Sequence, residues 1–284
     1  MDSSKYSQVT VISSKHKWFD LNLKEVWRYR DLIVLFTKRN FAVTYKQTIL
    51  GPAWLFINPL LTSIMHAIVF GGIAGINTEG VPQFLFYLTS NAIWIYFSSC
   101  VVNNASTFTN NASIFGKVYF PRLTISISNV LVAFFKFLIQ MAMVLVLLLY
   151  FIFTGTIQPN WLNWLMIPFI LIQLGIMGLG IGIIVSSMTT KYRDLSILVG
   201  FGVQLWMYGS PVVYPLSSVG EGRLRSLVLL NPVTAPIEAF RYAVLGQGTL
   251  LPEYMIYSLI FTVVVALLGI VIFNRVERTF MDTV

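Results

Sequence analysis

Long apolar runs separated by short polar segments make up this chain from about residue 50 to its end. No Asp, Glu, Lys or Arg occurs from Gln47 to Thr78, from Phe137 to Thr190 or from Tyr254 to Asn274. A helix needs roughly 20 apolar residues to cross the hydrocarbon core of a bilayer, so each gap is long enough for a crossing. The pattern predicts an all-α membrane protein with six spans, at about 53–75, 84–104, 125–152, 163–187, 197–214 and 254–274.

Lys and Arg are distributed unevenly among the connecting segments. Nine of them precede the first span, and two each lie between spans two and three, between spans four and five, and after span six. The other connecting segments contain three, so the count is fifteen against three. Cytoplasmic loops are enriched in Lys and Arg, and the distribution therefore predicts that both ends of the chain lie in the cytoplasm.

The first 22 residues lack the apolar core of a cleavable signal peptide. We expect a cytoplasmic tail and an interfacial helix at 1–50, and a six-helix transmembrane domain at 51–284. At 100° per residue, most charges of the helix Leu23–Phe41 share one arc and most apolar side chains lie opposite, although Arg30 and Leu35 break the pattern. Such a pattern suits a helix in the headgroup plane. Arg28 and Arg30 are candidate contacts to lipid phosphate. The helix is either an anchor only or also the frame of a lateral route for an amphiphile.

Composition agrees with the hydropathy pattern. Charged residues make up 11% of the chain, against about 25% in soluble domains, and the mean hydropathy is +0.76. The net charge of +8 follows from the cytoplasmic Lys and Arg and does not by itself indicate nucleic acid. We therefore expect no nucleic-acid partner.

Residues that carry catalytic or metal chemistry are sparse. Cys100 is the single cysteine, and His16 and His66 are too far apart in sequence for a metal-ligand motif. None of the predicted spans contains Asp or Glu, which argues against a membrane-embedded hydrolase, a metal-dependent transferase and an ion-coupled carrier. A Gly-rich phosphate loop is also missing. We expect no enzyme and no cofactor in this chain, with transport powered by a separate ATPase.

Five short segments carry a resemblance to a known family. They are TILGPAWLFINPL (Thr48–Leu60), GKVYFPRL (Gly116–Leu123), KYRDL (Lys191–Leu195), YGSPVVYP (Tyr208–Pro215) and LNPVTAPIEAFRYAVLG (Leu230–Gly246). Together with the six spans, they resemble the permease subunit of ABC transporters that export O-antigen, capsule and teichoic acid chains. The resemblance runs from about Trp27 to the C-terminus.

The resemblance implies a homodimer in the bacterial inner membrane, served by two nucleotide-binding subunits that bind ATP and Mg²⁺. It also implies that cytoplasmic loops form coupling helices seated in the ATPase. The matching residues are Lys117, Tyr119, Phe120, Pro121 and Arg122 after span two, and Tyr192, Arg193 and Asp194 after span four. The alternative is that the cations in these loops only enforce topology.

The segment 210–252 contains apolar runs that are too short to cross a bilayer. Re-entrant or interfacial helices fit such runs, because irregular backbone at membrane depth must pack on protein or line water. The resemblance implies an outer gate that includes Tyr214, Pro215, Glu238 and Arg241. Glu238 and Arg241 are three apart and can pair on one helical face. A passive cap is the alternative.

Several residues within the spans suit a sugar-lipid cargo. The rings of Trp54, Phe56, Trp206 and Tyr208 lie on spans one and five, which resemble the channel-lining helices of the family, although ordinary packing is the alternative. Lys136 lies inside span three and either extends its ammonium toward the cytoplasmic end or contacts a lipid-linked pyrophosphate.

Small residues in span four indicate close helix packing. Gly178 and Gly182 are four apart and form a face on which another helix can approach closely. The partner helix belongs either to the same subunit or to its twin.

The sequence thus predicts the transmembrane subunit of an ATP-driven exporter of a polyprenyl-pyrophosphate-linked polysaccharide, with O-antigen as the first expectation. Capsule or teichoic acid precursors are alternatives within the class. A small-molecule or drug exporter and a membrane-embedded glycan-modifying enzyme are the alternatives outside it.

Overall fold

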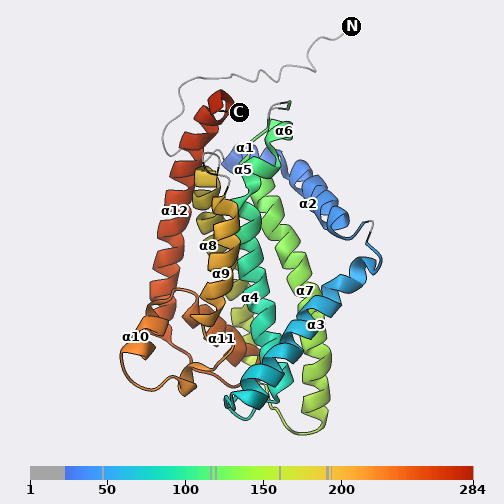
Figure 1. The fold of residues 1–284 in the computed structure, drawn as a ribbon, viewed down its shortest axis with the longest axis vertical. Coiled ribbons are helices and arrows are strands. Elements are labelled where there is room, and N and C mark those ends of the chain that lie inside the picture. The colour runs from blue at the N-terminus through green and yellow to red at the C-terminus, as the bar shows by residue number, and fades with distance from the viewer. Residues whose placement is uncertain are drawn as a thin grey trace.

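A computed structural model describes residues 23–46, 48–115, 117–118, 120–159, 161–189, 192 and 194–283. Within these residues the chain forms helices and connecting segments, without strands (Figure 1). The helices are α1 (Leu23–Arg28), α2 (Arg30–Tyr45), η2 (Gly51–Ala53), α3 (Trp54–His66), the π-helical η3 (Ala67–Ile73), α4 (Gln83–Ala105), α5 (Thr107–Asn110), α6 (Ala112–Phe115), α7 (Leu123–Phe153), η4 (Trp161–Leu165), α8 (Met166–Thr189), α9 (Leu195–Tyr208), η5 (Leu216–Ser218), α10 (Arg223–Leu230), α11 (Thr234–Leu245) and α12 (Pro252–Thr283).

Five helical segments are long and apolar enough to cross a membrane. They are Gly51–Ile73, Gln83–Ala105, Leu123–Phe153, Trp161–Thr189 and Pro252–Phe273. Five of the six predicted spans are therefore confirmed, and most of their bounds differ from the prediction by only a few residues. The tail at 1–22 lies outside the described residues.

The predicted span at 197–214 was too long. Its helix, α9, has 14 residues and ends at Tyr208. At 1.5 Å per residue α9 is about 21 Å long, whereas the hydrocarbon core is about 30 Å thick. The helix ends here because Gly209 favours a turn and Pro211 has no N–H and disfavours helical geometry in the preceding residue.

The predicted helix Leu23–Phe41 was wrong in one detail, because it is broken at Tyr29. This residue separates α1 from α2 with φ −91° and ψ 19°. Neither Gly nor Pro occurs there, so the sequence offers no signal for the break. Val26 and Phe36 on the apolar side are buried within the protein and Lys38 is exposed, while the position in the headgroup plane stays a prediction.

The helix α4 forms the centre of the bundle and packs against α3, α7, α8, α9 and α11. The helix α8 packs on one side against α4 and on another against α12. A side chain at Gly178 would place its Cβ 2.6 Å from the Cβ of Cys100 on α4, and one at Gly182 would lie 2.5 Å from the Cβ of Asn104. The close-packing face that the sequence predicted is thus confirmed, and its partner is α4 of the same chain.

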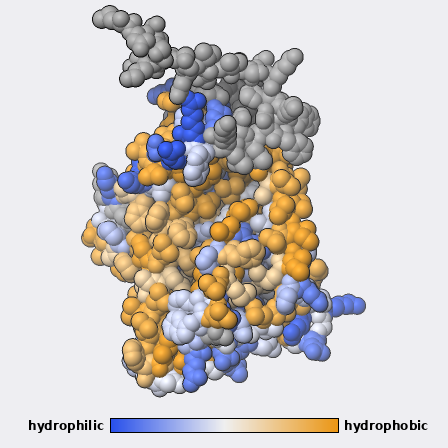
Figure 2. All heavy atoms as spheres, turned by 180° about the vertical axis from the view of Figure 1, so that it is seen from behind, coloured by the Kyte–Doolittle hydropathy of each residue, from blue (hydrophilic) through white to orange (hydrophobic). Residues whose placement is uncertain are grey.

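One end of the bundle carries α1, α5, α6 and the end of α12, and the opposite end carries α10, α11 and the segment between α3 and α4 (Figure 1). Apolar side chains dominate the middle of the face in Figure 2, and hydrophilic residues gather toward its ends. This belt fits a protein whose middle contacts lipid. The connecting segments that hold the candidate site residues are therefore displayed at the two ends.

Candidate functional site

A buried ion pair organises the end of the bundle that carries α10 and α11. Glu238 and Arg241, on successive turns of α11, form a salt bridge, and their side chains are 0% and 1% exposed. The predicted i,i+3 pair is therefore confirmed. Charges this deeply buried are stable only when further hydrogen bonds satisfy them.

Both partners of this pair hold backbone from neighbouring segments. Oε1 of Glu238 accepts a hydrogen bond from the Leu216 amide at 2.9 Å, and Oε2 accepts one from the Thr249 amide at 3.3 Å. Nη1 of Arg241 donates to the carbonyl oxygen of Pro211 at 3.0 Å. The pair therefore fastens the segments on both sides of α10 and α11 onto the bundle.

The guanidinium of Arg241 also faces α4. Its Cζ lies 4.6 Å from the ring centroid of Phe86, which is within cation–π distance. The helix α11 is buried along most of its length between α4 and α8. It is thus an internal part of the bundle, unlike α10, which has no buried residue.

Tyr214 and Pro215 lie in the segment that the ion pair holds. Pro215 is buried and Tyr214 is half-buried.

Asn231 joins the end of α9 to this same region, although sequence reasoning did not single it out. Its Oδ1 accepts a hydrogen bond from Nε1 of Trp206 at 3.0 Å. Its Nδ2 donates to the Gly209 carbonyl at 3.0 Å and to Oγ of Ser210 at 2.8 Å. Asn231 stands before a proline in the LNP motif, which was the available signal for a structural turn.

The four aromatic candidates on α3 and α9 have different surroundings. Trp54, Phe56 and Tyr208 are 38%, 43% and 49% exposed, so their rings are available to a partner or a cargo. Trp206 is partly buried, and its ring centroid lies 5.4 Å from that of Phe97 on α4. In the single chain Trp206 therefore packs α9 onto α4. Its role in lining a channel stays a prediction.

The candidate coupling loops meet at the end of the bundle that carries α5 and α6. The hydroxyl of Thr189, at the end of α8, donates to the carbonyl oxygen of Ala105 at 3.0 Å. The amide of Phe108 donates to Oγ of Ser186 at 3.3 Å. The segments that follow α4 and α8 therefore begin side by side.

Residues within these two loops divide into buried and exposed groups. Phe120 is buried against Phe36 of α2, with ring centroids 5.6 Å apart, and Arg122 is buried with its Cζ 5.2 Å from the ring centroid of Phe115. Lys117, Tyr192 and Asp194 are exposed, and Pro121 is half-buried. Tyr119 and Arg193 lie outside the described residues.

The candidate lipid-phosphate contacts lie on three helices. Arg28 on α1 and Arg30 on α2 are exposed. Nε of Arg30 lies 4.0 Å from Oδ1 of Asp31, an exposed pair that contributes little to stability. Lys136 is half-buried on α7, about 20 Å along the helix from Leu123. The structure does not bring Lys136 together with either arginine.

A small polar cluster joins α3 to α4 within the bundle. Nδ2 of Asn91 donates to Oγ of Ser63 at 3.0 Å and lies 3.2 Å from Nδ1 of His66. All three residues are buried. This contact gives His66 a structural role in the helix interface. Among the described residues, no group of three His, Cys, Asp or Glu could hold a metal ion.

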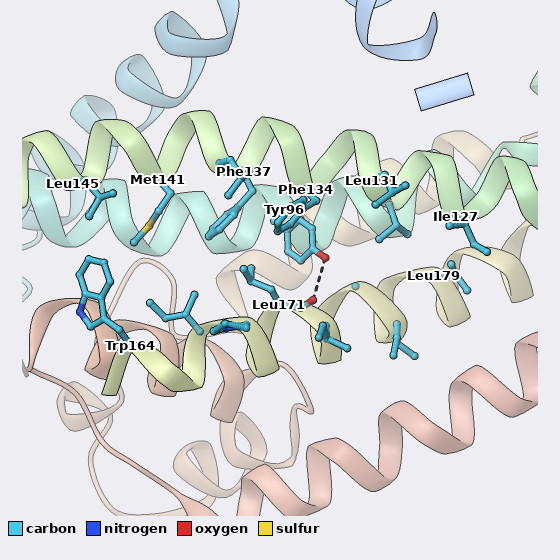
Figure 3. Close-up of a pocket in the computed structure, with 17 residues that line it drawn as sticks. Tyr96, Ile127, Leu131, Phe134, Phe137, Met141, Leu145, Trp164, Leu171 and Leu179 are labelled. Atoms are coloured by element: carbon cyan, nitrogen blue, oxygen red, sulfur yellow. Dashed lines mark hydrogen bonds between the residues drawn. The ribbon is translucent and has the colours of Figure 1, made fainter. Parts of the chain in front are cut away.

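A groove of about 730 Å³ separates α7 from α8 (Figure 3). Its walls are apolar, and the hydroxyl of Tyr96 donates to the Leu171 carbonyl at 3.0 Å instead of being offered to the groove. Such walls suit hydrocarbon and offer no group to orient the hydroxyls of a sugar. The groove is therefore a poor candidate for a glycan site.

Comparison with known proteins shows a family to which the chain is similar. The family model described as ABC-2 type transporter matches residues 31–245. The chain is 30% identical over 254 residues to an O-antigen export system permease protein RfbA of Klebsiella pneumoniae, covering 89% of this chain and 94% of that protein.

Two further relatives are more distant. An O-antigen export system permease protein RfbA of Myxococcus xanthus is 28% identical over 224 residues, with 77% of this chain and 82% of that protein covered. The capsule polysaccharide export inner-membrane protein CtrC of Neisseria meningitidis serogroup A is 23% identical over 257 residues, covering 84% and 89%. The family match extends from α2 to the end of α11, across four of the five long spans and the buried ion pair. The chain therefore belongs to the ABC-2 type transporter family.

Proposed function

We propose that this chain is the transmembrane subunit of an ATP-driven exporter that moves a polyprenyl-pyrophosphate-linked polysaccharide, first of all O-antigen, across the bacterial inner membrane. The observation that carries the proposal is the similarity to permeases named for O-antigen export over most of both chains. The similarity to a capsule export protein makes capsule the second candidate cargo.

The proposed topology has six crossings, with both ends of the chain in the cytoplasm. The unequal distribution of Lys and Arg supports this orientation. The position of α1 and the end of α12 at the same end of the bundle is consistent with it (Figure 1). In this arrangement α9 crosses together with the segment that follows Tyr208, since the helix alone is too short. The tail and interfacial helix occupy 1–50, and the transmembrane domain occupies 51–284.

The ATPase subunit, which would hold ATP and Mg²⁺, docks at the end formed by α5, α6 and the segment after α8. The adjacency of the two loops and the exposure of Lys117, Tyr192 and Asp194 support this location. In the proposal Tyr119 and Arg193 belong to the same surface. Beneath this surface, the movement is transmitted by Phe120, Pro121 and Arg122. They belong to a rigid aromatic cluster, which passes a displacement of the loop on to α2 and α7.

Two copies of the chain form the conduit in this proposal, with α3 and α9 facing each other across it. The exposure of Trp54, Phe56 and Tyr208 supports this arrangement, because flat rings bind sugar C–H faces without fixing the chain in place. Arg28, Arg30 and Lys136 are proposed to contact lipid phosphate. The segment fastened by Glu238 and Arg241, with Tyr214 and Pro215, closes the outer exit.

Deletion and complementation in the native cell test this function. Loss of the chain should remove the surface polysaccharide and cause its lipid-linked form to accumulate inside. Expression of the chain together with its ATPase should restore the surface polysaccharide, and expression with an ATPase that cannot hydrolyse ATP should not. Export without any active ATPase, or modification of a glycan by the isolated chain, would contradict the proposal.

A further inference from the structure

A tight turn between α3 and α4 presents one carboxylate in a strained geometry. Glu79 has a φ of +57°, and no other non-glycine residue among those described has a positive φ. A left-handed non-glycine residue is strained and persists only where its surroundings enforce it. Such strain often accompanies function, and two sets of contacts hold Glu79 in place.

Hydrogen bonds within the turn enforce this conformation. Oδ1 of Asn77 accepts from the Glu79 amide at 3.0 Å, and the buried hydroxyl of Thr78 donates to the Val81 carbonyl at 2.6 Å. The next residue, Gly80, also has a positive φ, at +81°. The turn is therefore organised to point the Glu79 side chain in one direction.

The Glu79 carboxylate meets a segment far away in the sequence. Oγ of Ser217, in η5, donates a hydrogen bond to Oε1 of Glu79. Glu79 follows α3 and Ser217 follows α9, the two helices proposed to face the conduit. This contact thus bridges the connecting segments that follow these two helices.

The two sides of the bridge are anchored differently. Next to Ser217, the Leu216 amide is held by Glu238, which is itself paired with Arg241 inside the bundle. The turn that carries Glu79 lies between Gly75 and Gly80, and an added Cβ at either glycine would contact no atom within 4 Å. The α9 side is therefore anchored by a buried ion pair, and the α3 side is held by hydrogen bonds within the turn itself.

The Glu79 carboxylate also lacks part of its hydrogen bonding in the closed contact. Oε2 of Glu79 is buried and has no hydrogen-bond partner in the described part of the chain. A buried polar atom without a partner is destabilising, and opening would give this oxygen to water. The unpartnered oxygen therefore lowers the cost of opening the bridge.

We propose that Glu79 and Ser217 form a latch that holds the outer ends of α3 and α9 together at rest and must open for cargo to leave. The proposal rests on the proposed function, because it assigns the latch to the outer exit of the same conduit. ATP binding by the partner subunit opens the latch by moving α3.

Cysteine cross-linking tests the latch. The variant carries Glu79→Cys and Ser217→Cys, and its only other thiol, Cys100, is buried. A glutamate side chain is long, so the backbones at positions 79 and 217 are too far apart for a direct disulfide between the two cysteines. A short methanethiosulfonate cross-linker, which a reductant removes, is used instead. Each single-cysteine variant serves as the control.

Two readouts are measured. In membranes that contain the ATPase, we expect rapid bridging without nucleotide and much slower bridging after ATP and vanadate trap the closed ATPase. In cells, we expect surface polysaccharide to fall in proportion to the bridged fraction and to recover after reduction. Equal bridging in both nucleotide states, or normal export by fully bridged chains, would overturn the latch.

The two readouts separate the latch from the proposed function. Bridging in membranes requires no cargo, so it reports on the latch even if the cells export no polysaccharide. Absence of export by the unmodified chain would refute the proposed function alone. Equal bridging with intact export by the unmodified chain would refute the latch alone.

Discussion

Gly182 of α8 lies against Asn104 of α4 so closely that an added Cβ would be 2.5 Å from the Cβ of Asn104 and 2.7 Å from the carbonyl oxygen of Val101. Neither neighbour can move without moving α4. The backbones of α4 and α8 are therefore in direct contact, which only a residue without a side chain permits.

The first prediction follows from this contact. Gly182→Ala should destabilise the protein by about 1–3 kcal/mol, the usual range for overpacking a close interface. Gly200→Ala on α9 is the matched control, because a Cβ there meets nothing within 4 Å and Ala favours helix over Gly. Thermal unfolding in detergent measures both. Equal unfolding temperatures for the two variants would contradict the close packing.

The second prediction concerns the buried ion pair. Glu238→Leu leaves the Arg241 charge buried without its partner and should destabilise the fold by about 3–5 kcal/mol. Asp31→Leu breaks the exposed pair with Arg30 and should change stability by about 0–1 kcal/mol. The folded fraction after purification and the unfolding temperature are the measurements. Similar losses from both variants would show that burial of the pair does not matter.

The third prediction concerns the end of α9. Asn231→Ala removes the acceptor of Trp206 Nε1 and the donor to Gly209 and Ser210, which should destabilise the protein by about 1–3 kcal/mol. Gln204→Ala, at an exposed position of the same helix, should leave stability nearly unchanged. Thermal unfolding is the test. An Asn231→Ala variant with the unfolding temperature of the unmodified protein would refute the anchoring role.

The fourth prediction concerns the ATPase surface. Lys117→Glu reverses an exposed charge in the loop after α4 and should reduce co-purification of the ATPase while leaving the unfolding temperature unchanged. Lys46→Glu, exposed beyond the end of α2, is the charge-matched control and should bind the ATPase normally. If both variants retain the ATPase equally, the docking surface lies elsewhere.

Local patterns in the sequence were sufficient for several features. The spans at Gly51–Ile73 and Leu123–Phe153 follow from hydropathy, because the bilayer selects runs of apolar residues whatever their tertiary partners. Glu238 and Arg241 pair because residues three apart on a helix are always neighbours.

Other features depend on how distant segments pack. The sequence placed Phe120 and Arg122 in a coupling loop, but the fold buries both in the aromatic cluster with Phe36 and Phe115. It placed Trp206 on a span, whereas the contact with Phe97 and the bond to Asn231 come from helix packing. Burial is a property of the assembled bundle, and hydropathy along the chain does not reveal it.

The sequence by itself thus determined the class of protein, five long spans and the contacts made within one helix, because these depend on composition and on spacing along the chain. Only the tertiary structure decided which helix Gly182 touches, where α9 ends relative to Asn231, and that Glu79 meets Ser217 across 138 positions. Contacts between residues so far apart depend on the crossing geometry of whole helices, which no local pattern encodes.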